Sequence, residues 1–120
     1  MNFTIPLAPI TKKNSQRILI NQSTKKPFIA QSEKYKEYEK ACAYFIKGKD
    51  LKIDYPVTVK CIYYMPTKRR VDLLNLLAAT HDILVKYEVL ADDNSSIIYS
   101  VDGSRVLYDK DNPRTEIEIF

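Results

Sequence analysis

Glycine, histidine and cysteine are scarce in this sequence, and each scarcity excludes a class of site. Two glycines are too few for a glycine-rich phosphate-binding loop. A single histidine, His81, and two cysteines, Cys42 and Cys61, do not provide the clustered ligands of a structural zinc site. Because both cysteines lie in apolar patterns without CxxC spacing, we expect them to be reduced core residues of a cytosolic protein.

Long apolar runs are also absent. No window approaches the roughly 20 apolar residues that a membrane-spanning helix needs. The first residues lack the basic and apolar segments of a signal peptide. The composition, 45% apolar and 28% charged over 120 residues, is that of an ordinary globular chain. We therefore predict one domain over residues 1–120 with a cytoplasmic location and no membrane partner.

The net charge of +4 conceals a steep gradient along the chain. Residues 1–70 carry 15 Lys and Arg against 5 Asp and Glu, a balance of +10. Residues 71–120 carry 4 against 10, a balance of −6. A basic part followed by an acidic part suggests a polyanionic partner and a cation site, although solvated surface charge would give the same totals.

Hydrophobic periodicity predicts an α+β domain, with a mixed β-sheet backed by two α-helices. Apolar residues alternate from Val57 to Met65, which is typical of a half-buried strand. Asp102-Gly103 is a favoured turn pair, so we expect the strands on either side of it to form a hairpin. The other strands are expected at 2–7, 18–20, 27–29, 97–101, 106–108 and 115–119.

Two segments repeat apolar residues at helical spacing. The first, 33–47, follows Ser32 as N-cap and ends at Gly48. The second runs from about 72 to 87. The expected buried stripe of the first helix is Tyr35, Tyr38, Cys42 and Phe45, and that of the second is Leu73, Leu76, Leu77, Thr80, Ile83 and Leu84.

Acidic residues are the best candidates for chemistry. His81 has no Cys, Ser or carboxylate at local spacing to form a triad, so we expect a surface or boundary histidine. Asp72 follows the basic cluster Lys68-Arg69-Arg70, and Asp92-Asp93 comes after the helix. Separately, Asp72 is a good N-cap and Asp92-Asp93 a good turn. Together, such carboxylates and a basic loop suit Mg²⁺ and a phosphate backbone.

These residues also carry a resemblance to a known family. The segments 69–75, Asp82-Ile83-Leu84 and Leu90-Ala91-Asp92-Asp93 resemble the RusA Holliday junction resolvases, especially their phage and prophage members. Lys12-Lys13-Asn14-Ser15, the Ser32 to Tyr38 segment and the tail from Asp102 to Arg114 are similar too. The similarity spans essentially the whole chain, and its specificity lies in the order and spacing of the motifs.

The resemblance implies an Mg²⁺-dependent homodimeric endodeoxyribonuclease that resolves four-way DNA junctions. Its catalytic, metal-binding carboxylates fall on Asp72 and Asp93, with Asp92 and Asn75 as further candidate ligands. Two positions differ, because Leu74 stands where the family has a second Asp and Ala78 where it has Lys. Asp102 is a candidate third carboxylate, and Arg69 or Arg70 could supply the missing positive charge.

Candidate DNA contacts lie in the basic part of the chain. We expect phosphate contacts from six side chains, Lys12, Lys13, Arg17, Lys68, Arg69 and Arg70. The Lys25-Lys26 hairpin tip could reach a second DNA arm. Two alternatives stay open: a branched-DNA-binding protein that has lost catalysis, and an RNA-binding or interaction module that uses its nine tyrosines for stacking. No small-molecule substrate is expected.

Overall fold

A computed structural model describes residues 1–12, 16–31, 33–46 and 50–120. Ser32 and Gly48, proposed as helix boundaries, lie outside these residues, as does Lys13. The elements in chain order are β1 (Asn2–Ile5), β2 (Gln16–Ile20), β3 (Pro27–Gln31), α1 (Glu33–Ile46), β4 (Val57–Met65), α2 (Leu73–Lys86), β5 (Ile98–Ser100), β6 (Arg105–Tyr108) and β7 (Arg114–Ile119).

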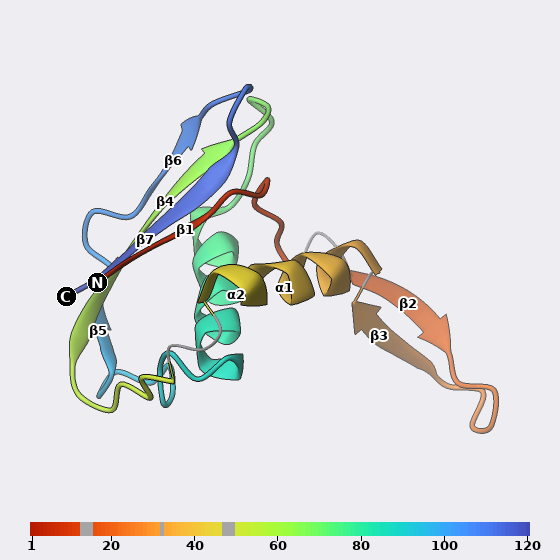
Figure 1. Cartoon of the computed structure of the whole chain (residues 1–120). Helices are drawn as coiled ribbons and strands as arrows, with labels where there is room; N and C mark the ends of the chain where they lie inside the picture. The colour runs from red at the N-terminus through yellow and green to blue at the C-terminus, as the bar shows by residue number, and fades with distance from the viewer. Residues whose placement is uncertain (13–15, 32, 47–49) are drawn as a thin grey trace.

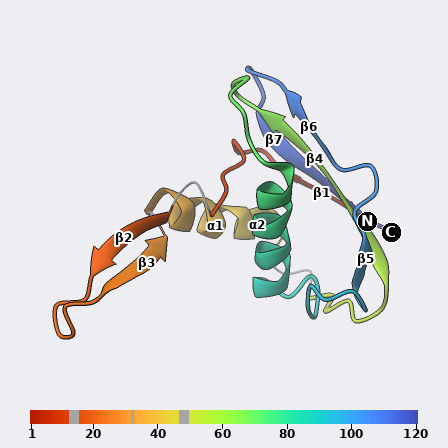
Figure 2. The same cartoon turned by 180° about the vertical axis from the view of Figure 1, so that it is seen from behind.

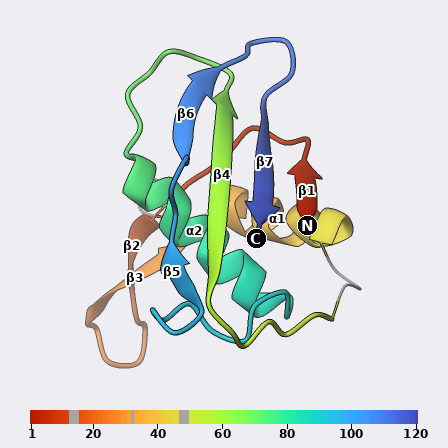
Figure 3. The ribbon, with the colours of Figure 1, turned by 90° about the vertical axis from the view of Figure 1, so that its left-hand side faces the viewer.

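The main sheet has five strands and mixed pairing. β7 lies between β1 and β4 and is antiparallel to both, whereas β5 and β6 pair parallel with β4 on its other side. Both helices cover the same face of this sheet (Figure 3). The structure therefore confirms the predicted α+β domain with a mixed sheet backed by two helices.

The core lies between the sheet and the helices. β4 contributes Val57, Val59, Cys61 and Tyr63, all buried, which confirms the alternation expected from the sequence. The Tyr63 hydroxyl lies 2.6 Å from the Thr80 hydroxyl of α2, and Thr80 in turn donates to the carbonyl of Leu76. This chain of hydrogen bonds satisfies the buried polar groups between β4 and α2.

The first helix buries a slightly different stripe from the one expected. Tyr35, Tyr38 and Cys42 are buried as predicted, but Phe45 is exposed and Ile46 takes its place. Three helical turns span about 10.8 residues, so position 46 returns almost to the direction of position 35. Position 45 falls short of that direction, which explains why the prediction for Phe45 was wrong.

The second helix follows the prediction closely. Asp72 is its N-cap in extended conformation, and its Oδ1 accepts a hydrogen bond of 2.9 Å from the backbone N–H of Leu74. The helix ends at Lys86, with Tyr87 as C-cap. Of the expected stripe, all members are buried except Leu73, which is partly buried. A carboxylate thus opens the helix that carries much of the core.

Burial on α2 leads to a stability prediction. Leu84 is fully buried, so its replacement by Ala should lower the free energy of unfolding by about 2–5 kcal/mol through lost contacts and a cavity. Leu74 on the same helix is 71% exposed, and Leu74→Ala should cost less than about 0.5 kcal/mol. Urea unfolding of both variants would measure the difference. Equal losses would contradict this placement of α2.

The hairpin expected around Asp102-Gly103 is not formed. β5 and β6 do not pair with each other, because both run along the same edge of β4. At the turn between them, the Ser104 N–H donates to the Val101 carbonyl, and the Ser104 hydroxyl accepts from the N–H of Cys61 in β4. Ser104 therefore keeps this segment attached to β4. The chain continues along the same edge of β4 after the turn and does not reverse its direction.

The hairpin formed by β2 and β3 projects away from the rest of the molecule (Figures 1 and 2). Its strands pair antiparallel from Gln16 with Gln31 to Ile20 with Pro27, as the sequence predicted. The turn at its tip is held by the Asn21 side chain, which accepts from the N–H groups of Ser23 and Thr24. Lys25 and Lys26 are exposed at this tip.

Candidate functional site

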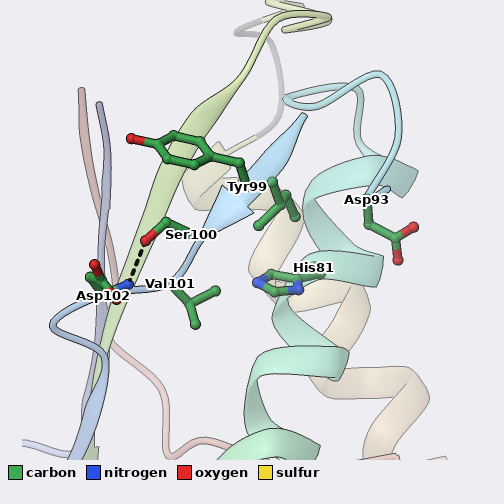
Figure 4. Close-up of a pocket in the computed structure, with 7 residues that line it drawn as sticks. His81, Asp93, Tyr99, Ser100, Val101 and Asp102 are labelled. Atoms are coloured by element: carbon green, nitrogen blue, oxygen red, sulfur yellow. Dashed lines mark hydrogen bonds between the residues drawn. The ribbon is translucent and has the colours of Figure 1, made fainter. Parts of the chain in front are cut away.

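An open cleft of about 660 Å³ lies between α2, the turn that follows it and the β5 segment (Figure 4). Polar groups enter the cleft from both walls, from α2 and its following turn on one side and from β5 on the other. The lining residues are His81, Asp93, Ile98, Tyr99, Ser100, Val101 and Asp102. Two acidic residues from separate parts of the sequence, Asp93 and Asp102, thus line the same cleft.

The two adjacent carboxylates of the turn differ in their surroundings. The Asp92 carboxylate accepts hydrogen bonds from the Asp93 N–H at 2.8 Å and from the Asn94 side-chain amide at 3.1 Å. These bonds lower the pKa of Asp92, the one from the Asp93 backbone most strongly. Asp93 lines the cleft instead. Asp92 therefore shapes the turn that presents Asp93.

His81 enters the cleft from the middle of α2. Its ring is partly buried, and its Nε2 atom is buried with no hydrogen-bond partner among the described residues. Burial lowers the pKa of His81, while the carboxylates of Asp93 and Asp82 act in the opposite direction. The prediction of a boundary histidine is confirmed, but local sequence spacing gave no sign that β5 and the Asp93 turn would form a cleft around it.

Asp102 lies in the same cleft as Asp93, on the opposite side of His81 (Figure 4). The Asp102 N–H donates to the Ser100 hydroxyl at 3.1 Å, which fixes the backbone at this edge. The sequence suggested Asp102 as a third carboxylate near the start of α2, whereas the cleft is beside the middle of that helix. Within the described ranges, no group of three or more His, Cys, Asp or Glu side chains is placed to hold one metal ion.

Asp72 and Asn75 lie at the start of α2 and do not line the cleft. Asp72 is exposed, and one of its oxygens caps the helix. His81 comes nine positions after Asp72, which corresponds to about 13 Å along the helix axis. A shared role for Asp72 and Asp93 stays a prediction.

The predicted phosphate-binding residues differ in whether their charged groups are free to contact DNA. Lys12 forms an ion pair with Asp82 at 2.8 Å and lies over the Tyr35 ring, so its ammonium already has partners. Arg17 lies in β2, and its side chain is outside the described part of the structure. By contrast, Lys68, Arg69 and Arg70 are exposed, and none of them forms an ion pair with another described residue. We call these three residues the basic loop.

The cysteines are unsuited to nucleophilic chemistry. Both are free thiols buried in the core, as the sequence predicted. Burial raises the pKa of Cys42 to about 11 and that of Cys61 to about 12. Because the thiolate is the nucleophile, both groups are inert in the folded protein near neutral pH.

The comparison with protein families gives a match over nearly the whole chain. The family described as Endodeoxyribonuclease RusA matches residues 6–120. The chain belongs to the RusA family of endodeoxyribonucleases. This confirms the resemblance drawn from the order of the motifs. A search of curated proteins found no match.

This RusA-family chain differs from the family pattern at Leu74 and Ala78. Both residues are on the exposed side of α2. Leu74 is 71% exposed, and Ala78 is exposed one turn later. Neither residue contributes to the buried core, so packing does not explain Leu74 and Ala78. No helix in the described part of this RusA-family chain is long and apolar enough to cross a membrane.

Proposed function

We propose that this RusA-family protein is an Mg²⁺-dependent endodeoxyribonuclease that cuts four-way DNA junctions. The observation that carries the proposal is the cleft in which Asp93 and Asp102 lie on either side of His81, in a chain of the RusA family. The basic loop precedes α2 directly and provides three exposed cations for the phosphate backbone. Paired cuts would come from a two-fold symmetric homodimer, in which each subunit cuts one strand.

The candidate donor groups are of the chemical type that Mg²⁺ binds. This ion prefers oxygen ligands, and proteins bind it through one or two carboxylates together with waters and substrate phosphates. Asp93 is the first candidate ligand, with Asp102 across the cleft and Asp72 at the helix start as candidates for the second. Asn75 could offer a carbonyl oxygen. Bound Mg²⁺ would neutralise phosphate charge and activate a water.

The residues of the chain itself have separate tasks in this proposal. The basic loop holds the backbone of the strand to be cut, and the Lys25-Lys26 tip of the hairpin contacts another arm. Asp92 keeps its hydrogen bonds within the turn and orients Asp93. Burial lowers the pKa of His81, which favours its neutral form, and the ring lies between the two carboxylates.

A second candidate function is junction binding without cleavage. Leu74 supports it, because a leucine side chain cannot bind a cation. Ala78 supports it as well, because an alanine cannot stabilise charge that develops on phosphate. The basic loop would be unaffected by the loss of catalysis. A protein with this second function would therefore bind the same DNA without cutting it.

One assay separates these functions. The protein is incubated with an end-labelled four-way junction, with Mg²⁺ or with EDTA, and with a linear duplex of the same sequence. Paired nicks near the branch that need Mg²⁺ would support the nuclease. Tight junction binding without nicks would support the second function. Equal affinity for junction and duplex would contradict both.

The basic loop gives a prediction on salt dependence. For B-DNA, each phosphate contact adds about 0.9 to the slope of log affinity against log salt. Replacing Lys68, Arg69 and Arg70 by Ala should reduce the steepness of that slope by about 2.7 and weaken junction binding about 100-fold at 0.1 M salt.

Fluorescence anisotropy between 50 and 400 mM salt would measure this slope. Replacing Lys34, Lys36 and Lys40 on α1 by Ala gives a control with the same change in net charge, and all three are exposed. If both triple variants lose the same affinity, the effect is one of net charge and the assignment of the basic loop is wrong.

A further inference from the structure

An exposed tyrosine lies beside the basic loop, at the end of β6. Tyr108 pairs in register with Met65, the last residue of β4, and the N–H of Asp109 donates to the Met65 carbonyl. This fixes the backbone on both sides of the tyrosine. The chain from β4 to α2, which contains the basic loop, runs past this same end of β6 (Figure 3).

The Lys68 ammonium lies 5.2 Å from the centre of the Tyr108 ring. Such a cation is attracted by the electron-rich face of the ring. The tyrosine is nevertheless 46% exposed, so much of its surface is in contact with solvent. A partly exposed aromatic ring with a positive charge over it is thus present at the protein surface.

We propose that Tyr108 stacks on an unpaired DNA base while Lys68 contacts the adjoining phosphate. A nucleotide carries the two complementary features, a flat base and a negative charge. Bases within a duplex are already stacked and paired, so only an unpaired base can use the ring. The proposal rests on DNA being the substrate and adds that the protein recognises unstacked bases at a branch point.

The surrounding charges favour a nucleic acid at this position. Arg69 and Arg70 continue the basic loop, and the nearest carboxylate in sequence, Asp109, is neutralised by Arg114 at 2.9 Å. Arg114 also lies over the ring of Tyr64, so this second tyrosine is already covered by a cation that Asp109 and Glu116 hold in place. By contrast, Lys68, the cation over Tyr108, has no acidic partner among the described residues.

The test uses a fluorescent base. A duplex with one unpaired 2-aminopurine, the same duplex fully paired, and a four-way junction are titrated with protein in EDTA. Stacking of Tyr108 should quench the unpaired 2-aminopurine, and Tyr108→Leu should remove the quenching and weaken binding to that duplex about 10-fold. Tyr108→Phe should behave as the original protein, because stacking does not need the hydroxyl.

Tyr55→Leu is the matched control. Tyr55 is 58% exposed and lies two positions before the first residue of β4, at the opposite end of this strand from Tyr108. Unchanged quenching in Tyr108→Leu would overturn the stacking proposal, even if the protein still prefers junctions to duplex. If the protein does not prefer junctions to duplex, the proposed function is wrong. The duplex with one unpaired 2-aminopurine would still decide whether Tyr108 stacks on a base.

Discussion

Asp93→Asn is expected to lower cleavage of a four-way junction by at least about 100-fold while leaving junction binding in EDTA intact. Asn has the shape of Asp but not its charge, and loss of even an indirect metal partner costs about 10- to 100-fold in affinity or activity. Asp93 lines the cleft and is exposed, so the fold should tolerate the change. Single-turnover cleavage and gel-shift binding would measure the two effects separately.

Three further Asn variants make this experiment specific. Asp92→Asn should lose much less activity, because Asn keeps an oxygen to accept the N–H of Asp93. Asp102→Asn and Asp72→Asn show which carboxylate acts together with Asp93. A large loss only in Asp102→Asn would assign the reaction to the cleft, and one only in Asp72→Asn would assign it to the start of α2. If cleavage survives Asp93→Asn, the proposed active site is wrong.

Adding back the two family residues should have the opposite effect. The double variant Leu74→Asp and Ala78→Lys is expected to raise the cleavage rate by at least about 100-fold, since one well-placed electrostatic group contributes 10²- to 10³-fold. Both positions are exposed, and an Asp in the first turn of a helix interacts favourably with the helix dipole. The free energy of unfolding should therefore change by less than about 0.5 kcal/mol.

The single variants show which replacement matters. Leu74→Asp alone should lower the Mg²⁺ concentration needed for half-maximal cleavage, because it adds a ligand. Ala78→Lys alone should raise the rate at saturating Mg²⁺. A control with Leu74→Asn and Ala78→Gln alters size and polarity without adding charge. If the charged double variant is no faster than the original protein, Leu74 and Ala78 do not limit catalysis.

The sequence predicted the elements well wherever one face of an element is buried. β4, α2 and β7 have regular apolar spacing, and their bounds agree with the prediction to within a residue or two. Asp72 was correctly placed as an N-cap because capping is a local interaction. Phe45 departs from the buried stripe because neighbouring residues of a helix point about 100° apart, so choosing position 45 in place of 46 moves the side chain off the buried face.

The candidate site was harder to predict because it depends on pairing between distant segments. Asp102-Gly103 has the local chemistry of a hairpin turn, but β4 is long enough to pair with both neighbouring segments along one edge. This parallel arrangement is what brings Asp102 into the cleft with His81 and Asp93. Local spacing carries no information about such a pairing, so His81 had no assigned role.

The position of α2 has a consequence for where the protein would cut. The basic loop is at one end of this helix, and the cleft is beside His81, about 13 Å further along its axis. Since a B-DNA strand rises about 3.4 Å per nucleotide, this distance corresponds to about four nucleotides. With the reaction at the cleft, α2 would act as a rigid ruler that sets the distance between the phosphates bound by the basic loop and the position of the cut.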